Sequence, residues 1–373
     1  MIIPSRNYHT RIYMDTNREI IEKLLTEEKR ELSNKHLWIW GAGDTAVLYQ
    51  QGLSRLEEEG FVIEGYVDSD PKKQGNTIGT KQICEPETLY NIEDVCVLIC
   101  SIREEVLHSV KTELDKRKIE NYYLDEVILK NHANEVLACY DALGDEKSRE
   151  VYAGIIQWRV TGCRTRYPLN RTEDYFVLDS FKRSNKGEIF VDCGAYIGDT
   201  IERYCEVKGN NFKKIIAFEA DRINYQKLEK NIARLNHEYG LSDSKIVIHN
   251  CAVADKMGKI VFSRYENNDG IGSKITNYEA EGDCDVICLD EYLKEPYTFL
   301  KADIESFEYR MLQGAKKSIQ ANRPLLAICI YHSSIDLYSV PLLVKEIVPD
   351  YKFAVRHHAT DLSGTVLYAW REV

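Results

Sequence analysis

The stretch Ile189-Phe-Val-Asp-Cys-Gly-Ala-Tyr-Ile-Gly-Asp-Thr200 decides the fold. It begins as an apolar run of strand length, passes through Gly194 and Gly198, and leads into a segment with helical periodicity. Glycine permits a sharp turn at the end of a strand and lets a ligand approach the backbone closely. A strand, a glycine turn and a helix form the first unit of a nucleotide-binding α/β domain.

The charges and residue sizes around this turn indicate a class of ligand. Asp192 and Asp199 flank the turn, so a phosphate group would meet like charge. The next apolar run, 214–218, ends at Glu219, where a carboxylate can accept the hydroxyls of a ribose. Small residues in Asn250-Cys-Ala-Val-Ala-Asp255 suit the face of an adenine ring. The pattern favours a nucleoside that carries an amino-acid group over a dinucleotide.

Three regions follow from the alternation of apolar runs and helical patterns. Residues 1–130 are predicted to form a smaller Rossmann-like α/β domain, residues 131–185 a helical bridge, and residues 186–373 a larger α/β domain. The last two apolar runs of the chain are joined by a short loop, which predicts an antiparallel pair. Five parallel strands and a terminal antiparallel pair are typical of a Class I methyltransferase. The strands predicted for the larger domain are 188–193, 214–218, 245–250, 299–302, 325–330, 352–355 and 365–370, with a hairpin around 259–262.

The first domain carries a second glycine motif, Gly41-Ala-Gly43, between an apolar run at 36–40 and a predicted helix over 45–59. A later run ends near Asp68 and Asp70. This pattern is compatible with a nucleotide or nucleotide-sugar ligand. The alternative is a degenerate Rossmann module that serves dimerisation or substrate presentation.

Composition excludes several classes of protein. The 373 residues include 49 Lys and Arg against 60 Asp and Glu, a net charge of −11 that disfavours nucleic-acid binding. No apolar run approaches the roughly 20 residues that cross a bilayer. The first residues lack the apolar core of a signal peptide. We therefore expect a cytoplasmic protein with its 11 cysteines reduced, which forms a homodimer if it associates.

Five stretches form an ordered set: the glycine stretch, Ala217-Phe-Glu-Ala-Asp221, Asn250-Cys-Ala-Val-Ala-Asp255, Leu300-Lys-Ala-Asp-Ile-Glu-Ser-Phe-Glu308 and Met311-Leu-Gln-Gly-Ala315. Over about residues 186–370, this set resembles the FkbM family of S-adenosylmethionine-dependent methyltransferases. The resemblance implies a Class I fold, S-adenosylmethionine as cofactor, and O-methylation, often of sugar or polyketide hydroxyls. Ser306 stands where the family pattern K-x-D-x-E-G has glycine. The candidate cofactor-binding residues are Asp192, Gly194, Ala195, Tyr196, Gly198, Thr200, Glu219, Ala220, Ala252 and Asp303.

Asp303, Glu305 and His332 are the candidate catalytic residues. A sugar hydroxyl must be aligned with the methyl carbon and must lose its proton. Asp303, directly after an apolar strand, is the first candidate for the base, and His332 is the second because its ordinary pKa suits proton transfer near neutrality. In an alternative mechanism the three side chains hold a divalent ion, although no metal is expected. Two other functions stay open, a nicotinamide-dependent sugar oxidoreductase and a non-catalytic nucleotide-binding module.

Overall fold

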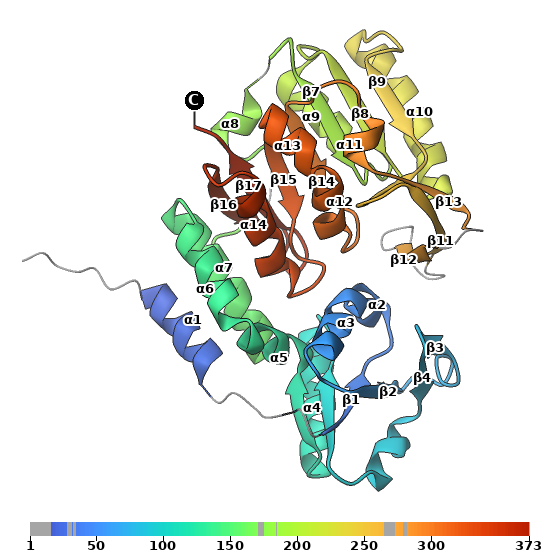
Figure 1. The fold of residues 1–373 in the computed structure, drawn as a ribbon, viewed down its shortest axis with the longest axis vertical. Helices are drawn as coiled ribbons and strands as arrows, with labels where there is room; N and C mark the ends of the chain where they lie inside the picture. The colour runs from blue at the N-terminus through green and yellow to red at the C-terminus, as the bar shows by residue number, and fades with distance from the viewer. Residues whose placement is uncertain are drawn as a thin grey trace, which may run out of the picture.

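A computed structural model describes residues 16–27, 32, 35–170, 175–183, 185–264, 273–278 and 282–372. Figure 1 shows two sheet-containing units, one built from the first part of the chain and one from the last, with long helices beside them. No helix in these described ranges is both long and apolar enough to span a membrane. The expectation about a signal peptide concerns residues 1–15, which lie outside the described ranges.

The larger sheet contains seven strands in the order β16-β17-β15-β14-β7-β8-β9. All neighbouring strands pair in parallel except β17, which is antiparallel to both β15 and β16. The predicted Class I architecture is thereby confirmed, and the terminal antiparallel strand is inserted between two others. The bounds are β7 (Ile189–Cys193), β8 (Lys214–Phe218), β9 (Ile246–His249), β14 (Phe299–Ala302), β15 (Leu325–Cys329), β16 (Lys352–His357) and β17 (Thr365–Trp370).

Helices cover this sheet, and a small sheet lies beside it. Every residue of the central strand β7 is buried, as expected for a parallel strand covered on both faces. The helices are α8 (Asp179–Lys182), α9 (Asp199–Lys208), α10 (Arg222–Tyr239), α11 (Leu289–Tyr292), α12 (Glu308–Gly314), α13 (Lys316–Asn322) and α14 (Asp336–Ile347). The small sheet has the order β10-β13-β11-β12, from β10 (Ala252–Val253), β11 (Gly258–Arg264), β12 (Ser273–Tyr278) and β13 (Cys284–Ile287).

The first unit has a six-stranded sheet in the order β3-β4-β2-β1-β5-β6. Its pairs are parallel except β3 with β4, which confirms a Rossmann-like arrangement. The single helix predicted over 45–59 is divided at Tyr49. The bounds are β1 (His36–Trp40), α2 (Asp44–Leu48), α3 (Gln50–Glu58), β2 (Ile63–Val67), β3 (Thr77–Ile78), β4 (Lys81–Cys84), a 3₁₀ helix (Pro86–Asn91), β5 (Val95–Ile99), α4 (Glu104–Lys116) and β6 (Glu120–Tyr123).

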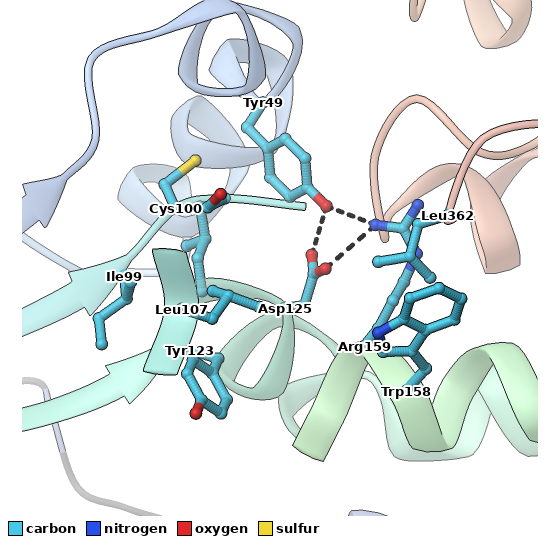
Figure 2. A pocket seen from close by; sticks show the side chains of 11 residues that line it. Tyr49, Ile99, Cys100, Leu107, Tyr123, Asp125, Trp158, Arg159 and Leu362 are labelled. Atoms are coloured by element: carbon cyan, nitrogen blue, oxygen red, sulfur yellow. Dashed lines mark hydrogen bonds and ion pairs between the residues drawn. The ribbon is translucent and has the colours of Figure 1, made fainter. Parts of the chain in front are cut away.

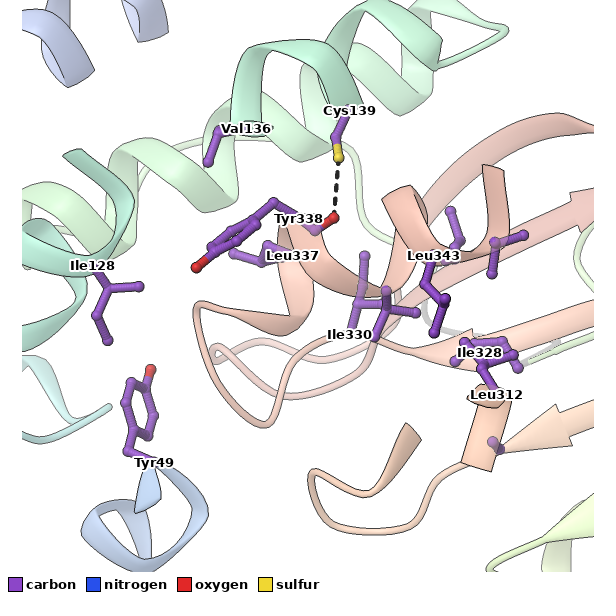
Figure 3. Packing of buried hydrophobic residues seen from close by; sticks show 14 of the residues in the cluster. Tyr49, Ile128, Val136, Cys139, Leu312, Ile328, Ile330, Leu337, Tyr338 and Leu343 are labelled. Carbon is purple, nitrogen blue, oxygen red and sulfur yellow. Dashed lines mark hydrogen bonds between the residues drawn. The ribbon is translucent and has the colours of Figure 1, made fainter. Parts of the chain in front are cut away.

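A group of helices joins the two units through a continuous apolar core. It comprises α5 (Leu124–Asn131), α6 (Ala133–Ala142) and α7 (Glu146–Thr161), and α1 (Thr16–Thr26) contacts all three. Figure 3 shows Tyr338 of α14 beside Cys139 of α6, whose thiol donates to the Tyr338 carbonyl at 3.4 Å. The ring of Tyr338 also stacks on His132, with centroids 4.7 Å apart. The helices therefore fix the larger unit relative to the smaller one.

Candidate functional site

The turn after β7 touches the turn after β14. Gly194 has a φ of 79°, and a Cβ atom there would lie 1.9 Å from the carbonyl oxygen of Asp303. The Asp303 amide donates to the Cys193 carbonyl at 3.0 Å. Only glycine permits this crossing, which places the glycine loop against the backbone of Asp303 in the predicted K-x-D-x-E motif.

The rest of the glycine loop leads into α9. Gly198 has a φ of 91° at the N-cap, and a Cβ atom there would lie 2.9 Å from Leu228 Cδ1 of α10. Ala195 is fully buried, and Thr200 is nearly so in the first turn of α9. These three residues shape the loop through packing, whereas Tyr196 is partly exposed.

Glu219 lies at the end of β8 with its carboxylate oriented by the glycine loop. One carboxylate oxygen accepts the Tyr196 amide at 2.8 Å and the other accepts the Asp221 amide at 2.8 Å. Each oxygen has a further lone pair, so the carboxylate retains acceptor capacity for ribose hydroxyls. Burial raises the pKa of Glu219 to about 7, although the two amides oppose this shift.

A small apolar cluster adjoins Glu219. Ala252 belongs to this cluster, and Ala220 packs against it. The Cys284 thiol donates to the Ala220 carbonyl at 3.8 Å. Small side chains next to a ribose-type carboxylate fit the adenosine part of S-adenosylmethionine.

Asp192 has a supporting role that differs from the expected ligand contact. Its side chain is completely buried and forms an ion pair with Lys301, at 3.0 Å between Oδ1 and Nζ. Lys301 also donates to the Gly194 carbonyl at 2.7 Å. Burial raises the pKa of Asp192 to about 6, against the effect of Lys301. Because its carboxylate has no exposed surface, Asp192 supports the glycine loop indirectly, through its ion pair with Lys301.

The three predicted catalytic residues are brought together at the carboxyl edge of the larger sheet. His332 Nε2 lies 3.2 Å from Asp303 Oδ1 and 3.6 Å from Glu305 Oε2. Asp303 also accepts hydrogen bonds from Tyr175 at 3.0 Å and Tyr331 at 2.9 Å. Burial alone would raise the pKa of Asp303, but His332, Lys301 and Tyr331 hold this pKa well below its ordinary value.

A fourth acid contacts the other nitrogen of His332. Glu308 Oε1 lies 3.3 Å from His332 Nδ1 and accepts the Ile304 amide at 2.7 Å. Both the Glu308 and His332 side chains are almost completely buried. Burial disfavours the imidazolium, but Glu308, Glu305 and Asp303 hold the pKa of His332 well above its ordinary value. In this environment the ring carries a proton at neutral pH.

Of the two predicted catalytic carboxylates, Asp303 and Glu305, Glu305 has the pKa nearer to neutrality. Burial raises its pKa to about 7, and the negative charges of Asp303, Glu308 and Asp44 add to the effect of burial. Glu305 and Ser306 have φ values of 54° and 71°, which explains why the family pattern has a glycine at the second position. Asp44 begins α2 of the first unit, so the carboxyl edges of the two units face each other.

Sequence reasoning gave Tyr175, Lys301, Glu308 and Tyr331 no role beside Asp303 and His332. The sequence does mark Lys301 as unusual, since it is the one charged residue in the buried strand β14. It marks Glu308 less clearly, as an acid three positions after Glu305 at the start of a helix. Tyr175 reaches Asp303 across 128 positions of the chain, which no local pattern shows.

The glycine motif of the first unit repeats the geometry of the larger one. Asp68 accepts the amides of Ala42 at 2.8 Å and Asp70 at 2.9 Å, as Glu219 accepts those of Tyr196 and Asp221. Here, however, the Lys73 ammonium lies 3.0 Å from Asp68 Oδ2. Lys73 therefore occupies acceptor capacity that a ribose would need, which favours the degenerate Rossmann module over a dinucleotide site.

A pocket at the carboxyl ends of β5 and β6 is lined by residues of the first unit, of the joining helices and of the larger unit. Figure 2 shows Tyr49, Asp125 and Arg159 converging there. Arg159 Nη1 donates to the Tyr49 hydroxyl at 2.6 Å and to Asp125 at 3.0 Å. Its Nη2 donates to the carbonyl of Tyr331 at 2.5 Å. One buried guanidinium thus joins the first unit, the helices and the turn that carries His332.

Comparison with known proteins bears on the family and the fold of the chain. Residues 192–348 match the family model described as the methyltransferase FkbM domain. The crystal structure of methyltransferase FkbM from Methylobacillus flagellatus KT is 22% identical, covers 96% of this chain and 94% of its own, and has a TM-score of 0.53. An rRNA methylase from Streptococcus thermophilus is 15% identical, with 51% and 89% covered and a TM-score of 0.31. Aeropyrum pernix fibrillarin, in complex with S-adenosyl-L-methionine, is 14% identical, with 50% and 67% covered and a TM-score of 0.30. No curated protein matches the chain.

Proposed function

We propose that this methyltransferase, in which residues 192–348 form a domain of the FkbM family, transfers the methyl group of S-adenosylmethionine to a hydroxyl oxygen of a carbohydrate or other small acceptor. The observation that supports this most is the contact between the glycine loop and the cluster of Asp303, Glu305 and His332. A cofactor loop and a proton-accepting group are the two parts that such a reaction requires.

Residues of the larger unit would hold the cofactor. Glu219 accepts the ribose hydroxyls through its remaining lone pairs, while Ala220 and Ala252 border the adenine. Gly194 lets the glycine loop lie directly against the backbone of Asp303, which keeps the loop next to the candidate catalytic residues. The bound cofactor supplies an electrophilic methyl group on a sulfonium, so the protein need only align the acceptor and manage its proton.

Glu305 is the base in this proposal. The acceptor oxygen forms its bond to the methyl carbon as the sulfur–carbon bond breaks, and the hydroxyl proton passes to the Glu305 carboxylate. A pKa of about 7 leaves Glu305 largely ionised at physiological pH yet able to take a proton. His332 already carries a proton, so it serves as a hydrogen-bond donor, and Asp303 orients the imidazolium and the acceptor.

The acceptor would enter between the two units, where Asp44 faces Glu305. Carboxylates and the phenols of Tyr175 and Tyr331 are partners for neutral hydroxyl groups. The same acids repel an anionic acceptor. A neutral sugar or polyol therefore fits this site better than a phosphorylated one.

Two experiments test the proposal. Calorimetry measures the binding of S-adenosylhomocysteine, and labelled cofactor shows whether any of a panel of glycans is methylated. Asp303→Asn should lower turnover at least about tenfold with cofactor affinity nearly unchanged. Glu305→Gln should do the same, whereas Glu295→Gln, which alters an exposed carboxylate, should change neither quantity. Tight NAD binding without S-adenosylhomocysteine binding would instead favour the oxidoreductase. Cofactor binding without methylation of any acceptor would favour the non-catalytic module.

A further inference from the structure

The surroundings of His332 have an excess of negative charge. Its imidazole lies among the carboxylates of Asp303, Glu305 and Glu308, and the nearby Lys301 is engaged with Asp192. One proton on the ring balances only one of the three charges. An acidic cluster of this kind inside a protein requires either further protons or a cation.

Two buried groups in this cluster lack hydrogen-bond partners. The second carboxylate oxygen of Glu308 is buried and makes no hydrogen bond, and neither does either ring nitrogen of His332. Both nitrogens nevertheless lie within 3.3 Å of a carboxylate oxygen. These atoms therefore lie close together without being aligned for hydrogen bonds to one another, and a shared cation would satisfy them together.

We propose that Asp303, Glu308 and His332 bind one divalent cation of the Mg²⁺ or Mn²⁺ kind. One ligand atom from each of the three residues lies within 4.8 Å of the others, close enough to surround a single ion. Two carboxylate oxygens and one imidazole nitrogen suit these cations. The two carboxylates neutralise the ion. With the ion bound, His332 is a neutral ligand and no longer the protonated hydrogen-bond donor that it is in the metal-free chain, while Glu305 remains the base.

The burial of the ligands determines where the ion is accessible. The side chains of Glu308 and His332 are 0% and 1% exposed, while that of Asp303 is 27% exposed. The open coordination positions therefore lie on the side of Asp303 and the glycine loop. An acceptor hydroxyl bound there would have a lowered pKa, and Glu305, which stays outside the ligand set, would receive its proton. This inference rests on the proposed function, because it assigns the cation to the acceptor site.

The inference can be tested with the full chain after a chelator has removed any bound metal. Mn²⁺ is then added, and its binding is measured by electron paramagnetic resonance. We expect one Mn²⁺ per chain, displaced by Mg²⁺, with echo modulation from one imidazole nitrogen that His332→Gln abolishes. Glu308→Gln should weaken binding about tenfold or more. Glu305→Gln should retain the native Mn²⁺ affinity while it loses turnover.

A second cluster, formed by Glu104, His108 and Cys163, supplies the matched control. His108→Gln should leave Mn²⁺ binding unchanged. Loss of binding in His108→Gln with retention in His332→Gln would overturn the assignment, and so would the absence of any binding at about 1 mM Mn²⁺. Two measurements in the presence of a chelator separate the cation proposal from the methyltransferase proposal. They are S-adenosylhomocysteine binding by calorimetry and methylation of the acceptor. Full turnover without metal would remove the cation and leave the methyltransferase proposal standing.

Discussion

Lys301 lies opposite Asp192 across strands β14 and β7, with 3.0 Å between Nζ and Oδ1. The two side chains are 2% and 0% exposed. Lys301 also donates to the Gly194 carbonyl, so the ion pair supports the cofactor loop from inside the sheet. Both members of the pair are needed, because either charge alone would remain buried without compensation.

The variant Lys301→Met should lower the free energy of unfolding by about 3–5 kcal/mol, since it leaves Asp192 buried and unpaired. The double variant Lys301→Met/Asp192→Leu should recover most of this loss, because no charge remains in the sheet. Urea denaturation of the two variants and the native chain measures both effects. A double variant as unstable as the single one would show that packing, not charge, accounts for the loss.

Replacing Gly194 by alanine should disrupt the crossing of the two turns. The new Cβ would lie 1.9 Å from the Asp303 carbonyl oxygen, so one of the turns must move. Gly240 provides the control, since it is left-handed, with φ 62° and ψ 37°, and nothing lies within 4 Å of a Cβ there. Gly240→Ala should cost only about 1–2 kcal/mol of backbone strain. Gly194→Ala should cost more and also weaken S-adenosylhomocysteine binding in calorimetry, and equal effects of the two changes would contradict the close contact.

Much of the larger sheet was predictable because its strands are apolar runs that end at turn residues. The predicted runs 214–218, 299–302 and 365–370 coincide with β8, β14 and β17. The hairpin predicted around 259–262 corresponds to the antiparallel pair of β11 and β12, of which β11 covers 258–264. Strand β13 was not predicted, since it lies in a polar segment where pairing partners, not apolar periodicity, determine the strand. The division of the predicted helix at Tyr49 has a similar cause, because this residue is fixed by distant contacts with Asp125 and Arg159.

The positions of Asp303, Glu305 and His332 followed from one rule, that the carboxyl ends of parallel strands meet at one edge of a sheet. The charge states of these residues did not follow from the sequence. His332 was a candidate base because of its ordinary pKa, but the buried Glu308 beside Nδ1 reverses this expectation. Protonation depends on which charges surround a group in three dimensions, and Glu308 acquires its influence only once α12 packs against His332.

Cofactor affinity should depend on pH through Glu219, whose pKa is raised to about 7 by burial. The ionised carboxylate accepts the ribose hydroxyls more strongly than the protonated form does. Above pH 7 the group is ionised and binding is at its strongest, and affinity should fall as the pH drops from 8 to 6, by up to about tenfold per unit below the pKa. Calorimetric titration with S-adenosylhomocysteine across this range measures the effect.

The variant Glu219→Gln should bind S-adenosylhomocysteine more weakly at pH 8, and this affinity should no longer change with pH. The matched control is Asp68→Asn, because Asp68 holds the corresponding loop of the first unit. It should leave the affinity and its pH dependence as they are in the native chain. A native affinity that does not change between pH 6 and 8 would exclude Glu219 as the ribose ligand.

Arg159 should act on turnover through the Tyr331 carbonyl that it holds (Figure 2). Arg159→Met alone leaves Asp125 buried without its cation and should destabilise the fold by about 3–5 kcal/mol. The double variant Arg159→Met/Asp125→Leu removes both charges and should stay folded. It should still lower kcat severalfold, because the turn bearing His332 loses its anchor, while S-adenosylhomocysteine affinity is unchanged since Glu219 and Gly194 lie elsewhere. Native kcat in the folded double variant would show that the guanidinium stabilises the junction without positioning the catalytic turn.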